Sequence, residues 1–278
     1  DHRTDMATTG TRSFRKGSWL QADHGAKFTR AGANADYGQR TERWLTKLLN
    51  ARASRNKDIY EFGVYTGRRM RDWGKLVRGF GHMYGFDSFS GFPDEAPGNA
   101  VPSKNWREGG DSAADALHMW NESSLFSYLR RRIGYQNLTL VPGYFNESLT
   151  PQLSMQHHFQ PALLVHMDCN MYISTLQAMR WVLQNRILVP SSYLRYDDWP
   201  GNLTKDTSQQ LIRKWQKLGL PLSGYWGQMK AHVEVSDEFR VSWRRINRNV
   251  FELVSVGGAI DHAISPQAVA GCQYPPCF

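Results

Sequence analysis

The chain has 278 residues, of which 41% are hydrophobic, and a formal net charge of +9 at pH 7. This length and apolar content suffice for one α/β domain with a substantial core. No apolar run approaches 18 residues, so we expect no membrane span. The three cysteines are too few for a disulfide scaffold, and the polar residues 1–10 lack the apolar stretch of a signal peptide. We therefore expect a cytoplasmic protein.

The basic residues are scattered in short runs such as Arg130–Arg132. Such runs are typical of solvated helix and strand faces, although they would also attract an acidic partner. The sequence carries no zinc-finger or RNP-type motif, which disfavours nucleic acid as the partner.

Hydrophobic periodicity predicts alternating helices and strands. The expected helices are at 37–52, 67–78, 124–133, 172–185 and 206–218. The expected strands are at 58–65, 81–87, 138–145, 161–168 and within 187–198, and they largely alternate with these helices along the chain. The segments 231–243 and 249–256 are expected to form a β-hairpin. This alternation is typical of a largely parallel sheet with helices on both faces. The predicted fold is therefore α/β and Rossmann-like, with seven strands.

The expected organisation is one domain over residues 36–256. Residues 1–35 read as an irregular arm and residues 257–278 as a tail. A stretch rich in glycine and proline lies inside an insertion at 90–120 and suggests a lid.

The first motif, EFGVYTG at residues 61–67, lies where a strand runs into a helix. Gly63 and Gly67 would let the backbone approach a ligand, and the free N–H groups of the following helix would point at it. The spacing is G-x-x-x-G rather than G-x-G-x-x-G, which disfavours a dinucleotide and an NAD(P) oxidoreductase. The alternative is a simple strand-to-helix turn.

The second motif centres on Asp87, which ends a predicted strand 24 residues after Gly63. An acidic residue in this position can accept hydrogen bonds from ribose hydroxyls. Ser88 and Phe89 would then border an adenine. The alternative role for Asp87 is a helix N-cap.

Three further carboxylates follow two neighbouring strands. Asp168 ends the most apolar strand, and Asp197 and Asp198 end the next one. Carboxylates that converge in one cleft repel each other unless a cation separates them, and oxygen ligands suit Mg²⁺. We therefore expect a site for Mg²⁺ or another divalent cation, unless one of the Asp197/Asp198 pair caps a turn. His166 shares a strand face with Asp168 and is a weaker candidate for the general base.

With these motifs, the chain resembles the macrocin O-methyltransferase family. Four segments over residues 58–200 carry the resemblance: EFGVYTGRRM, YGFDSFSGFPDE, VHMDCNMYISTLQAM and YDDWPG. The family consists of class I enzymes that use S-adenosylmethionine, typically with Mg²⁺, to methylate sugar hydroxyls. Two positions depart from its usual pattern, since Asn170 stands where an Asp is usual and Arg69 stands where smaller residues are common.

The resemblance implies a role for each matched residue. The cofactor would be bound by Glu61, Gly63, Tyr65, Gly67, Asp87, Ser88, Phe89, Gly143, Tyr144 and Asp168. The cation would be held by Asp168, Asp197 and Asp198. Asp168 and Asp197 would act in catalysis, with His166 as the weaker candidate.

The implied function is a Mg²⁺-dependent transfer of a methyl group from S-adenosylmethionine to a hydroxyl of a small molecule, such as a sugar or a natural-product intermediate. One alternative is a methyltransferase acting on a phenol, a polysaccharide or a polyketide. Another is a binding module that keeps the fold without turnover, for which Asn170 is the sequence support. A homo-oligomer is compatible with the sequence.

Overall fold

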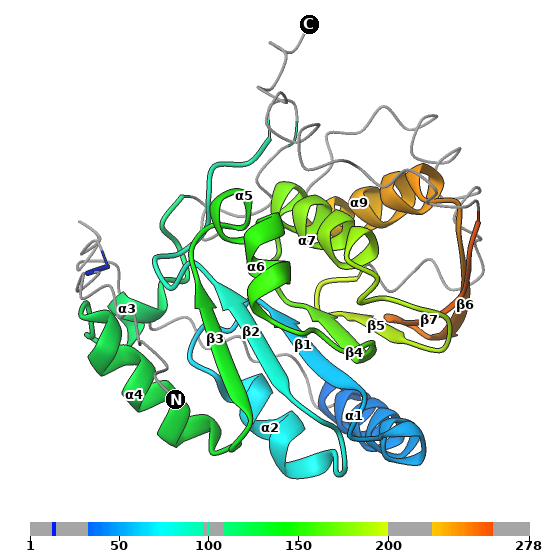
Figure 1. Cartoon of the computed structure of the whole chain (residues 1–278), viewed down its shortest axis with the longest axis horizontal. Coiled ribbons are helices and arrows are strands. Elements are labelled where there is room, and N and C mark those ends of the chain that lie inside the picture. The colour runs from blue at the N-terminus through cyan, green and yellow to red at the C-terminus, as the bar shows by residue number, and fades with distance from the viewer. Residues whose placement is uncertain (1–12, 15–32, 97–98, 100–107, 200–223, 258–278) are drawn as a thin grey trace, which may run out of the picture.

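The computed structural model describes residues 13–14, 33–96, 99, 108–199 and 224–257. They contain a seven-stranded sheet in the order β3-β2-β1-β4-β5-β7-β6 (Figure 1). The strands are β1 (Asp58–Phe62), β2 (Met83–Asp87), β3 (Leu138–Pro142), β4 (Ala162–Met167), β5 (Tyr193–Tyr196), β6 (Val241–Asn247) and β7 (Val250–Val256). Strands β1 to β5 are parallel, whereas β7 runs antiparallel to β5 and to β6. The predicted largely parallel, seven-stranded Rossmann-like fold is confirmed.

Helices cover both faces of this sheet (Figure 1). One face carries α1 (Ala33–Arg52), α2 (Arg68–Leu76), α3 (Ala113–Ala116) and α4 (Glu122–Ile133). The other carries α5 (Phe145–Ser148), α6 (Pro151–Gln156), α7 (Tyr172–Gln184) and α9 (Gly224–Glu238). Each layer has its own apolar core. Because β4 lies at the centre with helices on both sides, all six of its residues are buried, and its sequence is a continuous apolar run broken only by His166.

One predicted element is wrong. The first half of the expected hairpin, residues 231–243, is mostly the end of helix α9, and strand β6 starts only at Val241. The alternation of Val233 and Val235 resembles a strand pattern. However, α9 packs against both α7 and β6, so it is buried on more than one side and lacks the single apolar stripe of a surface helix. The strand predicted at 249–256 is confirmed as β7.

Several expectations fall on residues outside the described ranges. They include the helix at 206–218, the tail and most of the arm, although α1 begins at Ala33, inside the range assigned to the arm. The described ends of the insertion meet at its base, where the amide of Gly109 donates to the carbonyl of Phe92 (3.0 Å) and the amide of Phe92 donates to the carbonyl of Gly110 (2.9 Å). None of the described helices is long and apolar enough to cross a membrane.

Candidate functional site

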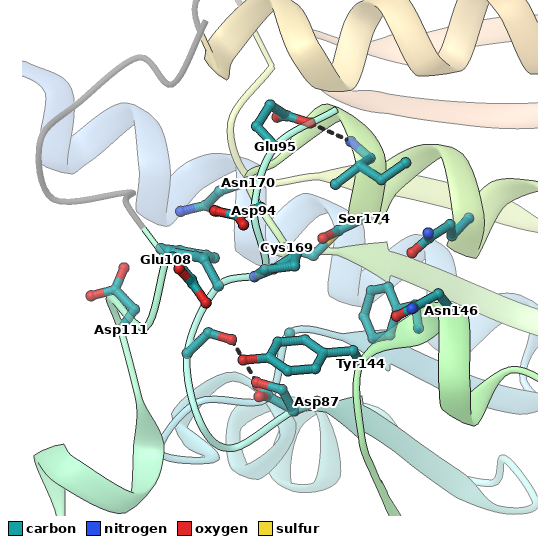
Figure 2. A pocket seen from close by; sticks show the side chains of 18 of the residues that line it. Asp87, Asp94, Glu95, Glu108, Asp111, Tyr144, Asn146, Cys169, Asn170 and Ser174 are labelled. Atoms are coloured by element: carbon teal, nitrogen blue, oxygen red, sulfur yellow. Dashed lines mark hydrogen bonds between the residues drawn. The ribbon is translucent and has the colours of Figure 1, made fainter. Parts of the chain in front are cut away.

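A cavity of about 710 Å³ opens at the carboxyl ends of β1, β2 and β4 (Figure 2). Its walls come from the turn after each of these strands, from helix α5 and its N-cap Tyr144, from the first turns of α7, and from both ends of the insertion. This edge of a parallel sheet is where open α/β folds bind their ligands. The predicted residues that line the cavity are Gly63, Tyr65, Asp87, Ser88, Tyr144 and Asp168.

Asp87 anchors the floor of the cavity. Its Oδ2 accepts hydrogen bonds from the backbone amides of Val64 (2.7 Å) and Tyr65 (2.8 Å), and its Oδ1 accepts one from Phe89 (2.6 Å). Burial raises the pKa of Asp87, and these three amides oppose that rise. A carboxylate offers about four acceptor positions, so Asp87 keeps capacity for a ligand hydroxyl. In Figure 2 Tyr144 lies beside Asp87 on the cavity wall.

The two glycines of the first motif serve packing as well as ligand access. Gly63 has φ of 95°, and a Cβ there would lie 2.1 Å from the carbonyl oxygen of Asp168. The turns after β1 and β4 can therefore touch only because residue 63 has no side chain. Gly67 has φ of 75° at the N-cap of α2, and a Cβ there would press on Ile133 of α4.

Behind the cavity floor, a chain of buried polar groups connects β1, β4 and β5. Nδ1 of His166 lies 3.0 Å from Oε2 of Glu61, and both side chains are fully buried. Nη1 of Arg195 lies 2.7 Å from Nε2 of His166. A guanidinium has donors only, so Nε2 accepts this hydrogen bond when the ring is neutral. Trp73 adds a hydrogen bond from Nε1 to Glu61 (3.2 Å).

The pKa of His166 reflects opposing influences in this chain. Burial lowers it, Glu61 raises it, Arg195 lowers it and Asp197 raises it, with a net direction upward. Both ring nitrogens already face protein partners, and the ring is not among the residues lining the cavity. The structure therefore offers no path by which His166 could touch a ligand in this cavity.

Asp197 is held by cationic side chains. Its Oδ1 lies 3.4 Å from Nη2 of Arg69, 3.3 Å from Nη2 of Arg195 and 3.8 Å from Nε2 of His166. Burial alone would raise the pKa of Asp197, but the contact with His166 and the charges of Arg195 and Arg69 bring it below its usual value. Asp197 is therefore an ionised carboxylate with its countercharges in place.

Asp168 and Asp198 show the opposite behaviour. Burial, with the Asp197 charge next in importance, raises the pKa of Asp168 to about 8 and that of Asp198 to about 7. Asp168 faces the cavity, whereas Asp198 is tied through its backbone amide to Gln228 of α9 (3.2 Å). Crowding of buried like charges is typical of functional sites.

The three predicted cation ligands lie close enough for their charges to shift one another's pKa. Among the described residues, the group whose ligand atoms all lie within 4.8 Å of one another is Glu61, His166 and Asp168, rather than Asp168, Asp197 and Asp198. In that group both ring nitrogens of His166 already lie against protein groups, Nδ1 against Glu61 and Nε2 against Arg195.

The cavity wall is strongly acidic. Seven carboxylates line it, namely Asp87, Asp94, Glu95, Glu108, Asp111, Glu147 and Asp168, and several of them are visible in Figure 2. The described lining includes no lysine, arginine or histidine. In a chain with net charge +9, this local excess of negative charge favours a cationic ligand and opposes one that carries a diphosphate.

Four predicted cofactor residues lie outside the cavity wall, and one of them is Gly67 at the N-cap of α2. Phe89 is fully buried and packs against Phe14 and Phe126. Glu61 is fully buried beneath the turn. Gly143 instead donates its backbone amide to the carbonyl of Asp87 (3.0 Å).

Sequence reasoning missed Glu95 and Arg195. Glu95 lies in the insertion, and its carboxylate accepts hydrogen bonds from the amides of Tyr172 and Ile173 (2.8 and 2.9 Å). Arg195 stands in the middle of the apolar strand β5. A charged side chain that is buried in an apolar strand must be paired. The presence of an arginine inside this apolar run could therefore have identified Arg195 from the sequence.

No family model matches the chain, and no curated protein sequence matches it significantly. Among solved structures, the chain is similar to CalS11, a calicheamicin methyltransferase, with 18% identity and a TM-score of 0.50, covering 77% of this chain and 79% of that chain. It also matches the O-methyltransferase NovP with 15% identity and a TM-score of 0.48 over 78% of both chains. At these identities the likeness to CalS11 shows the fold, which is the Rossmann-like fold of class I methyltransferases.

Proposed function

We propose that this protein binds S-adenosylmethionine in the cavity and transfers its methyl group to a hydroxyl oxygen of a small molecule. The observation that carries the proposal is the position of Asp87. In a sheet of this order, it ends β2 and faces the cavity with three amides fixing its orientation. A carboxylate held there can accept hydrogen bonds from the two hydroxyls of a ribose.

The charge of the cavity supports the same cofactor. S-adenosylmethionine carries a sulfonium and an ammonium group, and the acidic wall stabilises both. A dinucleotide would place a diphosphate against the same carboxylates, which repel it. The turn after β1 also lacks the close glycine spacing that a diphosphate needs.

Asp168 is the residue placed to move a proton. When bound, the cofactor supplies an electrophilic methyl group on a sulfonium sulfur. The acceptor oxygen forms the new bond to carbon as the carbon–sulfur bond breaks, and the hydroxyl proton passes to the Asp168 carboxylate. Asp168 lines the cavity, and its raised pKa of about 8 makes its carboxylate a better base than an ordinary aspartate. The products are S-adenosylhomocysteine and a methyl ether.

The acceptor is assigned at the level of its chemical class. We infer a hydroxylated small molecule, such as a sugar or a natural-product intermediate, which would bind beside the cofactor where the insertion and α7 contribute polar side chains to the cavity wall. Phenols, polysaccharide ends and polyketides are the competing acceptors.

The Mg²⁺ ion expected from the sequence is not part of this proposal. Asp197, one of the three carboxylates that would bind it, is already paired with two arginines. The steps above therefore use only the side chains of the chain itself.

Titration calorimetry tests the proposal directly. The full chain is titrated with S-adenosylmethionine, S-adenosylhomocysteine and NADH in a buffer with EDTA. We expect both adenosyl ligands to bind and NADH not to bind. Asp87→Asn should weaken binding by about tenfold or more, since it removes charge-assisted hydrogen bonds. Asp72→Asn, a partly exposed charge on α2, is the matched control and should bind as the wild type does.

Two results would contradict the proposal. Absence of binding by both adenosyl ligands, in EDTA and again when the titration is repeated with Mg²⁺, would exclude the cofactor. Unchanged binding by Asp87→Asn would exclude the assigned role of Asp87. If both ligands bind but no hydroxyl compound in a panel of sugars and phenols accepts the methyl group, the alternative of a binding module without turnover gains support.

A further inference from the structure

The position of Arg69 connects the start of α2 with the end of β5. Arg69 follows the left-handed turn at Gly67, and its neighbours Met70 and Trp73 bury the inner face of the helix. Its side chain is only 16% exposed and reaches Oδ1 of Asp197, 128 residues away in sequence. A long basic side chain held this far from solvent next to a carboxylate acts as a fixed countercharge.

Arg195, which lies in β5 two residues before Asp197, contacts the same oxygen. Its side chain is 6% exposed, and its guanidinium lies over the Trp73 ring at 5.6 Å while it contacts His166. Its orientation is therefore set by Trp73 and His166 as well as by Asp197. Two guanidiniums, which stay protonated at every physiological pH, thus converge on Oδ1 of Asp197.

These contacts change what Asp197 can bind. A Mg²⁺ ion on Asp197 would need to sit about 2 Å from a carboxylate oxygen, close to both guanidiniums. The like charges would repel one another, and the arginines would have to leave contacts that bury them. In the alternative ligand group of Glu61, His166 and Asp168, both ring nitrogens of His166 already lie against protein groups, Nδ1 at 3.0 Å from Glu61 and Nε2 at 2.7 Å from Arg195.

We infer that Arg69 and Arg195 take the place of a divalent cation at this site, so that the wild-type protein neither binds nor needs one there. The inference builds on the proposed methyl transfer and states which charges support it. Arg69 is the decisive residue, because it is the less buried of the two arginines and can be removed without opening the β5 core.

Mn²⁺ binding tests the inference with a readout separate from activity. The full chain is treated with EDTA and dialysed, and Mn²⁺ is titrated while free Mn²⁺ is followed by electron paramagnetic resonance. We expect no saturable binding below about 1 mM in the wild type. Arg69→Ala should bind Mn²⁺ at least about tenfold more tightly, because Asp197 becomes available. Arg68→Ala, the exposed neighbour, is the matched control and should behave as the wild type does.

The double variant Arg69→Ala/Asp197→Asn should lose the gained affinity. Submillimolar Mn²⁺ binding by the wild type that disappears in Asp197→Asn would overturn the inference, as would an Arg69→Ala variant that folds but gains no affinity. If Arg69→Ala does not fold, the Mn²⁺ affinities of the wild type and of Asp197→Asn alone decide whether the inference holds.

S-adenosylhomocysteine affinity, measured on the same samples with EDTA or with Mg²⁺, separates the two proposals. Equal affinity in both buffers agrees with a site that works without a cation. Loss of binding in EDTA overturns the inference while leaving the cofactor assignment intact. Absence of binding in both buffers overturns the proposed function, whatever the Mn²⁺ titration shows.

Discussion

The carboxylate of Glu95 accepts a hydrogen bond of 2.8 Å from the backbone amide of Tyr172. The same carboxylate also accepts from Ile173, so a residue of the insertion satisfies two free amides in the first turn of α7. This contact ties the insertion to the helix that follows β4, beside the cavity that both segments line.

Removal of this cap should loosen the insertion. Glu95→Ala is expected to cost about 1 kcal/mol of stability, as loss of a helix cap does, and to weaken S-adenosylhomocysteine binding severalfold. Limited proteolysis within residues 90–112 and calorimetry measure the two effects. Asp94→Asn, which removes a charge from the same segment without touching α7, should leave proteolysis unchanged. Equal cleavage of Glu95→Ala and the wild type would argue against the contact.

The close approach of Gly63 to Asp168 makes residue 63 intolerant of a side chain. Gly63→Ala must accept φ of 95° and a Cβ only 2.1 Å from a carbonyl oxygen. We expect a loss of at least about 2 kcal/mol in urea unfolding. Gly79→Ala is the control, since Gly79 also has positive φ (80°) but no atom within 4 Å of its would-be Cβ. That variant should lose only about 1 kcal/mol, and similar losses in both would refute the clash.

Substitution of Asp168 should lower turnover and raise stability. Asp168→Asn removes the proton acceptor, so methyl transfer is expected to fall about 100-fold or more. Burial and the Asp197 charge raise the pKa of Asp168 to about 8, so at pH 7 the wild type must take up a proton on folding, whereas Asn needs none. The free energy of unfolding at pH 7 should therefore rise by about 1 kcal/mol or more in the variant. Initial rates and chemical unfolding measure the two effects on one preparation. A variant with undiminished turnover would exclude Asp168 as the base.

His232 should make the fold sensitive to acid. The ring is fully buried among aromatic residues, Nδ1 lies 3.0 Å from the hydroxyl of Tyr196, and burial lowers the pKa of His232 to about 3. The unfolded chain binds a proton on this residue below about pH 6.5, whereas the folded chain does not until about pH 3. As the pH is lowered from about 6.5 to about 3, the free energy of unfolding should therefore fall by up to about 1.4 kcal/mol per pH unit.

The control for this effect is His232→Gln, which can still form a hydrogen bond with Tyr196. Its stability should depend less steeply on pH between 6.5 and 3, as followed by thermal unfolding in a series of buffers. Parallel pH profiles for the variant and the wild type would show that His232 does not contribute.

The sequence by itself determined the order of strands and helices and the positions at which strands end. Both properties depend on local periodicity and on turn residues. Asp87 and Asp168 were therefore predicted at the cavity edge, and the structure places both in its wall. Helix α9 was misread over part of its length because it is buried on more than one side, which removes the stripe from which a helix is recognised.

Only the tertiary structure decided which charges meet. Arg69 and Asp197 are 128 residues apart, Glu95 and Tyr172 are 77 apart, and neither pair leaves a pattern in the sequence. Of the three aspartates that suggested a cation site by position, Asp197 is neutralised by arginines from α2 and β5. Periodicity predicts which strand end a side chain occupies, but the direction of the side chain and its partners depend on how the layers pack.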